Sequence, residues 1–174
     1  MNVTVRHDDY DFRMNPQDYI DNHEKFIKAG IVETAVVQYT HDGNIPNYSD
    51  RLINYMKTAP NWDIQLHGWS HEEYDKLPPE EIMKHLDQSI AKADELFGIK
   101  PTVWYTPWNR RNEIMEDVAR SRGLTINNES YDIAKFIREV RAGEYKGHSV
   151  YFHLWNKDER EKIDEMLECA KELL

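Results

Sequence analysis

His67 and His71 stand four positions apart, directly after a short, largely apolar run. Asp8 and Asp9 form a second polar pair near the start of the chain. Two imidazoles and one carboxylate make a three-ligand metal site with an open position, the arrangement that catalytic zinc favours. The spacing alone is weak evidence, because the chain has eight histidines. A pair of surface or helix-capping histidines is therefore the alternative interpretation.

The composition limits the class of protein. The chain has 174 residues, 40% of them hydrophobic and 31% charged, which fits one soluble globular domain over residues 1–174. A net charge of -10 argues against nucleic acid or anionic membrane as a partner. A single cysteine, Cys169, excludes an internal disulfide. We find neither a long apolar run nor a signal peptide pattern and expect a cytoplasmic protein; the oligomeric state is left open.

Strands and helices alternate along the sequence, which predicts an α/β fold with a parallel sheet. The hydrophobic patterns, capping residues and glycines define these elements. The predicted strands cover residues 3–6, 34–39, 64–66, 102–105, 124–126 and 149–152, and the predicted helices cover 16–29, 50–58, 79–97, 113–122, 131–141 and 158–173.

In parallel sheets ligands bind at the carboxyl ends of the strands. Polar, metal-competent or aromatic residues follow all six predicted strands, at positions 7–9, 40–42, 67, 106–108, 127–129 and 153–155. We therefore expect one face of the sheet to carry a functional site. His41 and Asp42 either line this site or form a turn before Gly43, and the sequence favours neither.

The order and spacing of four segments resemble the motifs of the polysaccharide deacetylases, the NodB-like carbohydrate esterase family four. These segments are Asp8-Asp9, His67-x-x-x-His71, Thr106-Pro107-Trp108 and Phe152-His153. The resemblance implies a distorted, incomplete (β/α) barrel of about six to seven parallel strands. It also implies a divalent metal and removal of acetyl groups from N-acetylated sugars.

The resemblance assigns a role to each motif residue. Asp8 would be the general base, Asp9, His67 and His71 would bind the metal, and His153 would be the general acid. Zinc is the expected ion, with nickel, cobalt or iron as alternatives. The chemistry agrees with these roles, because amide hydrolysis needs a polarised carbonyl, an activated water and a proton for the leaving nitrogen.

Two motifs depart from the family pattern. Tyr10 stands where the first motif usually ends in glycine, and Tyr105 stands where an arginine usually orients the catalytic aspartate. We expect Arg110 or Arg111 to replace that arginine by contacting Asp8 or the substrate, with Arg6 as a further candidate. The fourth motif is not recognisable, and its nearest candidates are Asn127, Asn128, Glu129 and Asp132.

Several residues beside these motifs are expected to bind substrate. Aromatic rings stack on sugar faces, which favours a carbohydrate ligand, whereas Trp104 inside a strand is expected in the core. The predicted substrate-binding set is Trp69, Tyr105, Pro107, Trp108, Arg110, Arg111 and Trp155. The sequence thus predicts a deacetylase acting on a nucleotide-linked sugar, a lipid-linked sugar or a polymer precursor. The alternatives are an O-acetyl esterase on a sugar and a non-catalytic carbohydrate-binding protein that keeps the metal site.

Overall fold

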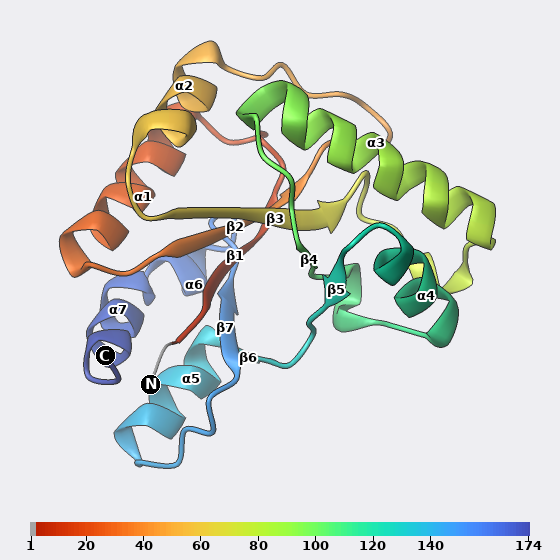
Figure 1. Cartoon of the computed structure of the whole chain (residues 1–174). Coiled ribbons are helices and arrows are strands. Elements are labelled where there is room, and N and C mark those ends of the chain that lie inside the picture. Colours follow the sequence, from red (N-terminus) through yellow and green to blue (C-terminus); the bar gives the residue numbers. More distant parts are fainter. Residues whose placement is uncertain (1–2) are drawn as a thin grey trace.

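Seven parallel strands form a single curled sheet in a computed structural model that describes residues 3–174 (Figure 1). The strand order is β5-β4-β3-β2-β1-β7-β6. The sheet does not close, because β5 and β6 are its two edges. This architecture is the predicted distorted, incomplete (β/α) barrel. Met1 and Asn2, which belong to the predicted domain, lie outside the described residues.

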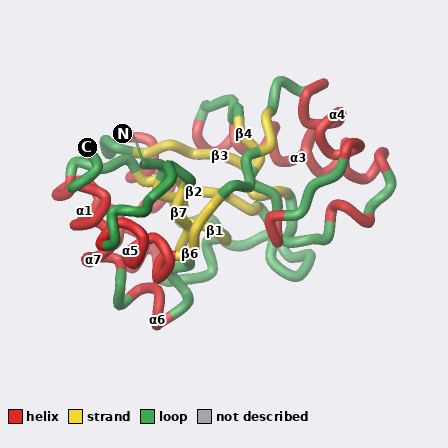
Figure 2. Tube along the Cα trace, turned by 90° about the horizontal axis from the view of Figure 1, so that it is seen from below, coloured by secondary structure: helices red, strands yellow, loops and turns green. Residues whose placement is uncertain are grey.

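Helices cover the outside of the curled sheet, as the central yellow strands and surrounding red helices of Figure 2 show. The strands are β1 (Val5–Tyr10), β2 (Glu33–Gln38), β3 (Trp62–Gly68), β4 (Val103–Trp104), β5 (Thr125–Ile126), β6 (Ser130–Asp132) and β7 (Ser149–Phe152). The helices are α1 (Pro16–Ala29), α2 (Asp50–Thr58), α3 (Pro79–Phe97), α4 (Glu113–Ser121), α5 (Ile133–Arg141), α6 (Lys157–Arg160) and α7 (Ile163–Lys171), with short 3-10 turns η1 (Tyr74–Lys76) and η2 (Pro107–Asn109). No helix within residues 3–174 is long and apolar enough to cross a membrane.

The element pattern agrees with the sequence except at three places. The first strand, predicted over residues 3–6, extends to Tyr10, so Asp8 and Asp9 lie within it and do not follow it. The predicted helix 131–141 begins at Ile133, because the Asp132 side chain accepts a hydrogen bond from the Lys135 backbone and caps α5. The residues just before it pair with β7 as the short strand β6, which the sequence analysis missed. The predicted last helix is divided into α6 and α7, and the Asn156 side chain caps α6.

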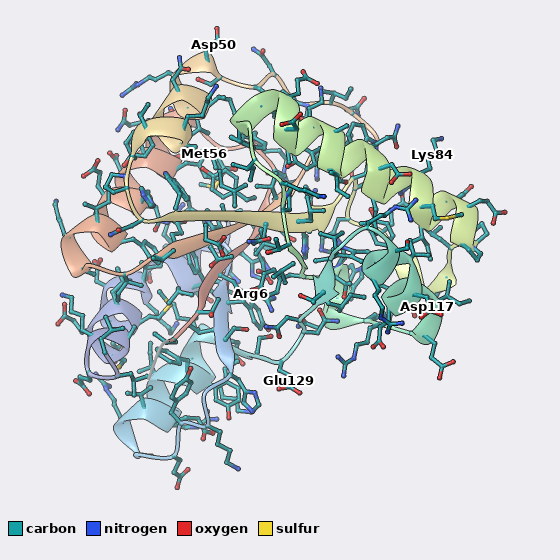
Figure 3. All side chains as sticks on the ribbon, in the orientation of Figure 1. Arg6, Asp50, Met56, Lys84, Asp117 and Glu129 are labelled. Carbon is teal, nitrogen blue, oxygen red and sulfur yellow. The ribbon has the colours of Figure 1, made fainter. Side chains whose placement is uncertain are left out.

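The two faces of the sheet have different chemistry. On β2, Ala35 and Val37 point outward and join the hydrophobic core against the helices. On β1, the alternate residues Arg6 and Asp8 form a buried ion pair on the inner face. Figure 3 shows Arg6 among the central strands, well inside the molecule. The inner face therefore holds the Arg6–Asp8 ion pair, whereas Ala35 and Val37 on the outer face are apolar.

The outer face contains one buried polar network, centred on Glu33. Its carboxylate is fully buried and lies 2.8 Å from Nδ1 of both His7 and His23, and it accepts a hydrogen bond from Asn22 at 3.0 Å. The other ring nitrogen of His23 faces the Pro60 carbonyl at 2.8 Å. This network joins β1, α1, β2 and the loop before β3. Burial alone would raise the pKa of Glu33, but the hydrogen bonds from His23 and His7 hold it below its ordinary value.

Glu33→Gln should lower the free energy of unfolding at neutral pH by about 3–5 kcal/mol, because it removes the charge that compensates two buried imidazoles. A carboxyl whose pKa is depressed by folding stabilises the fold above its unfolded pKa. That stabilisation is lost as the pH falls through the folded pKa. The difference between wild type and variant should therefore shrink in acid. Urea unfolding at several pH values measures this, with the exposed Glu81→Gln as control. A constant difference at every pH would contradict it.

Candidate active site

A β-bulge places Asp8 and Asp9 on the same side of the sheet. Neighbouring residues on a regular strand point to opposite faces. The register between β1 and β2 shifts after His7, so three steps on β1 match two on β2. Asp9 adopts a left-handed backbone with φ of 53°, a conformation that aspartate tolerates better than most residues. The extra residue turns the Asp9 side chain toward the site that Asp8 also faces.

The two predicted histidines meet Asp9 at the carboxyl end of the strands. Asp9 Oδ1 lies 3.1 Å from His67 Nε2 and 3.1 Å from His71 Nε2. One ligand atom from each residue lies within 4.8 Å of the others. Burial alone would raise the pKa of Asp9, but the two neighbouring imidazoles hold it well below its ordinary range. The carboxylate is therefore ionised, as a metal ligand must be.

The donor set fits a divalent ion. His67 Nδ1 lies 2.7 Å from the Tyr105 carbonyl and donates to it, so in the neutral imidazole Nε2 is the nitrogen that offers a lone pair. Among the described residues, His67 Nε2 and Asp9 Oδ1 are buried without a hydrogen-bond partner. Two imidazole nitrogens and one carboxylate oxygen that converge in this way suit zinc and related transition metals.

The loop between the two histidines is held by Tyr74. The Tyr74 hydroxyl accepts hydrogen bonds from the Trp69 and Ser70 backbone N–H groups at 3.0 and 3.4 Å. Gly68 allows this approach, since a Cβ there would lie 2.6 Å from the Tyr74 oxygen, and its φ is 148°. A glycine at this position lets the chain turn so that His71 returns to the site.

Asp8 is held by Arg6 from the same strand. Arg6 Nε donates to Asp8 Oδ1 at 3.1 Å, and Arg6 Nη2 donates to Oδ2. The fully buried guanidinium lies over the Tyr105 ring, 4.5 Å from its centroid, and 5.7 Å from that of Tyr151. Burial alone would raise the pKa of Asp8, but Arg6, with smaller effects from His67 and His153, holds it below its ordinary value.

Neither Arg110 nor Arg111 contacts Asp8, so this part of the expectation is wrong, whereas contact of either arginine with the substrate stays a prediction. The Arg110 guanidinium pairs with Glu73 and lies 3.8 Å from Asp75, and Arg111 lies 3.8 Å from Glu116. Both arginines instead lie near carboxylates close to their own loop. Arg6, the third candidate, provides the pairing because residues two apart on a strand share a face.

His153 lies on the opposite side of Asp9 from the histidine pair. Its Nε2 is 3.8 Å from Asp9 Oδ2, and its Nδ1 is 3.0 Å from Glu159 Oε2, which also accepts the His153 backbone N–H at 2.6 Å. Burial alone would lower the pKa of His153, but Glu159, Asp9 and Asp8 raise it above its ordinary value.

Glu159 was not recognised in the sequence, and the candidates for the fourth motif lie elsewhere. Asn128 bonds to Thr106, Glu129 lies 3.4 Å from His148, and Asp132 caps α5. A carboxylate six residues after His153, next to the capping Asn156, was the available signal.

The predicted aromatic residues divide into exposed and packed groups. Trp108 and Trp155 are 63% and 51% exposed, so their rings are open to a ligand. Tyr105 and Pro107 are buried, and Trp69 packs beside Tyr39 with the ring centroids 6.2 Å apart. Trp104 is fully buried, as predicted.

A pocket of about 470 Å³ opens beside the metal-ligand cluster. Its lining includes Asp9, His71 and Trp108 together with Arg13 and His41. The sequence alone allowed His41 either to line the site or to form a turn, and Arg13 is not among the predicted site residues. The structure brings both to the pocket because they follow β1 and β2, whose ends are adjacent.

We expect Asp9, His67 and His71 to bind one divalent ion, because their ligand atoms converge and lack other partners. His67→Ala, His71→Ala and Asp9→Asn should each lower bound zinc by about 10-fold or more at equal protein concentration. Elemental analysis after purification without chelator measures this. His148→Ala, which removes a histidine paired with Glu129 instead, is the matched control and should bind zinc like wild type. Equal metal content in all five proteins would refute the site.

Comparisons with known proteins agree with this architecture. The sequence profile described as polysaccharide deacetylase matches residues 16–127. No curated protein sequence matches the chain. The fold is similar to a family 4 carbohydrate esterase from Streptomyces lividans solved with acetate, at 15% identity and a TM-score of 0.78 over 99% of this chain and 88% of the other.

Two further solved structures have the same fold. The chitin deacetylase of Colletotrichum lindemuthianum has 16% identity and a TM-score of 0.79 over 97% of this chain and 82% of its own. A pseudoenzyme of the same esterase family from Bacillus anthracis has 14% identity and a TM-score of 0.77 over 99% of this chain, which spans 61% of the pseudoenzyme. Because the profile match covers more than half of its length, the chain belongs to the polysaccharide deacetylase family.

Proposed function

We propose that this protein is a metal-dependent hydrolase that removes an acetyl group from an N-acetylated sugar or glycan precursor. The observation that carries the proposal is that two adjacent carboxylates have different partners. Asp9 faces the histidine pair, whereas Asp8 is bound to Arg6. A divalent ion held by Asp9, His67 and His71 would polarise the acetyl carbonyl and acidify water.

Asp8 is the general base in this proposal. It is ionised, and Arg6 fixes the orientation of both its oxygens. Its lowered pKa makes it a weak base toward free water. An ion that acidified the attacking water would narrow the gap between the pKa of that water and the low pKa of Asp8.

His153 is the general acid. Hydrogen bonding of Nδ1 to Glu159 leaves Nε2 directed toward Asp9, on the side opposite the histidine pair. The raised pKa favours the protonated imidazole that an amine leaving group requires. Glu159 thus positions the ring and favours its charge, without touching the reacting atoms.

The substrate is a carbohydrate, and we propose a nucleotide-linked sugar, a lipid-linked sugar or a polymer precursor. The exposed Trp108 and Trp155 beside the site support a sugar ligand, because aromatic faces stack on sugar rings. The similarity to a pseudoenzyme favours a second candidate, a carbohydrate-binding protein without turnover. The intact Asp8–Arg6 pair and metal-ligand cluster favour the enzyme.

Zinc-loaded protein should release acetate from N-acetylated amino sugars, and Asp8→Asn should reduce that rate about 100-fold or more while metal content stays unchanged. The reason is that the amide of asparagine cannot accept the proton. Acetate release and elemental analysis provide the two measurements. Thermal unfolding checks that the unpaired Arg6 does not unfold the variant. Metal binding without turnover on any acetylated sugar would support the binding protein instead.

His153→Ala should impair amide hydrolysis much more than hydrolysis of an activated aryl acetate, because an amine needs a proton to leave and a phenolate does not. Rates on both substrates, with metal content determined in parallel, test this. Glu159→Gln keeps an acceptor for Nδ1 but removes the charge, so we expect a smaller loss with the same selectivity for amides. Equal losses on both substrates, or none on either, would remove His153 as the acid.

A further inference from the structure

The two carboxylate oxygens of Asp9 have separate partners. Oδ1 faces His67 Nε2 and His71 Nε2, each at 3.1 Å. Oδ2 accepts a hydrogen bond from the Trp155 indole Nε1 at 3.2 Å and lies 3.8 Å from His153 Nε2. The contact joins residues 146 positions apart, from β1 and from the turn after β7. Asp9 is therefore contacted by the histidine pair at the end of β3 and by the turn that follows β7.

The Trp155 indole can contact Asp9 only as a hydrogen-bond donor. The Trp155 N–H is a donor without acceptor capacity, and an ionised carboxylate is an acceptor without donors. Rotation about the last bond of an aspartate side chain is otherwise broad, so both oxygens could turn toward a cation. The hydrogen bond to Oδ2 restricts this rotation and leaves Oδ1 toward the two imidazoles.

Trp155 is itself held in place, although half of its surface is exposed. Its ring lies 5.2 Å from the His153 ring, measured between centroids. The backbone turns at this point, since Asn156 N–H donates to the His153 carbonyl at 3.1 Å, and the intervening Leu154 is buried. The backbone of Trp155 is thus part of a hydrogen-bonded turn, and its indole packs beside the His153 ring.

We propose that Trp155 is a positioning residue for the metal ligand Asp9. Its indole N–H holds Oδ2 away from the ion, so that Asp9 offers Oδ1 alone and a coordination position stays open for substrate and water. This inference rests on the metal site of the proposed function. It gives Trp155 a role in metal affinity that is separate from any stacking of its ring on a sugar.

The test is the affinity for Zn²⁺, measured by competition with a chromogenic chelator on metal-free full-length protein. Trp155→Phe keeps an aromatic ring and removes the donor, and it should weaken zinc binding about 10-fold. Trp108→Phe is the matched control. Trp108 is also exposed and lies beside His71, with centroids 4.8 Å apart, so its replacement should change the affinity less than about twofold.

Two further measurements keep the test decisive. Replacing the Trp155 indole with benzothiophene preserves the ring shape, so it should weaken zinc binding as Trp155→Phe does if the N–H is responsible. Cobalt loaded into Trp155→Phe should give a visible spectrum different from wild type, because the second oxygen of Asp9 is free to bind.

The outcomes separate the two proposals. Wild-type affinity in both Trp155 variants, or equal weakening in Trp155→Phe and Trp108→Phe, would overturn the role of Trp155 and leave the proposed function intact. Absence of zinc binding by wild-type protein would overturn the metal site, and the role of Trp155 with it.

Discussion

The alternation of side chains along a strand is the constraint on which this site depends. Asp8 and Asp9 are adjacent, and a regular strand would send one of them to the helices. The bulge in β1 removes this conflict with one left-handed residue, Asp9. A second shift, between Val37 and Gln38 of β2, lets β3 carry an extra residue at His67. Both strands that carry proposed metal ligands, β1 with Asp9 and β3 with His67, are therefore irregular at that residue, where bulges re-aim side chains.

Below the bulge the alternation is regular, and β1 uses it to keep two charged networks apart. Arg6 and Asp8 face the inside of the curled sheet, whereas His7 faces outward to Glu33 and His23. Each buried charge has a partner, because an unpaired one would cost several kcal/mol, on the order of 3–5. The inner pair serves the site, and the outer network fixes β1 against α1 and β2. The face to which each β1 residue points thus decides which of the two buried networks it joins.

The seven-residue segment 153–159, directly after β7, contains three proposed functional residues. These are His153, Trp155 and Glu159, and Asn156 caps the short helix α6 that carries Glu159. Glu159 bonds to His153 and Trp155 bonds to Asp9, so one local structure orients both the proposed acid and a proposed metal ligand. His153 therefore finds its carboxylate partner six residues further along the chain, in the helix that follows β7.

The sequence by itself determined the class of fold, and it predicted three residues that the structure brings together, Asp9, His67 and His71. Periodicity, caps and glycines located nearly every helix and strand, because these signals are local in the chain. His67, His71 and the aspartate pair were recognisable by residue type and spacing. The sequence also contained the Arg6–Asp8 pairing, since residues two apart on a strand share a face.

Tertiary structure decided the rest. The split of roles between Asp8 and Asp9 depends on a bulge, which is a register shift against β2 and leaves no composition signal. The sequence allowed the loop residues Arg110 and Arg111 to reach the site, but in the structure both pair with neighbouring carboxylates. The contact of Trp155 with Asp9 joins strands that are neighbours in the sheet and distant in the chain. Which charges pair, and which oxygen of Asp9 faces the histidines, follow from three-dimensional distances that one sequence does not encode locally.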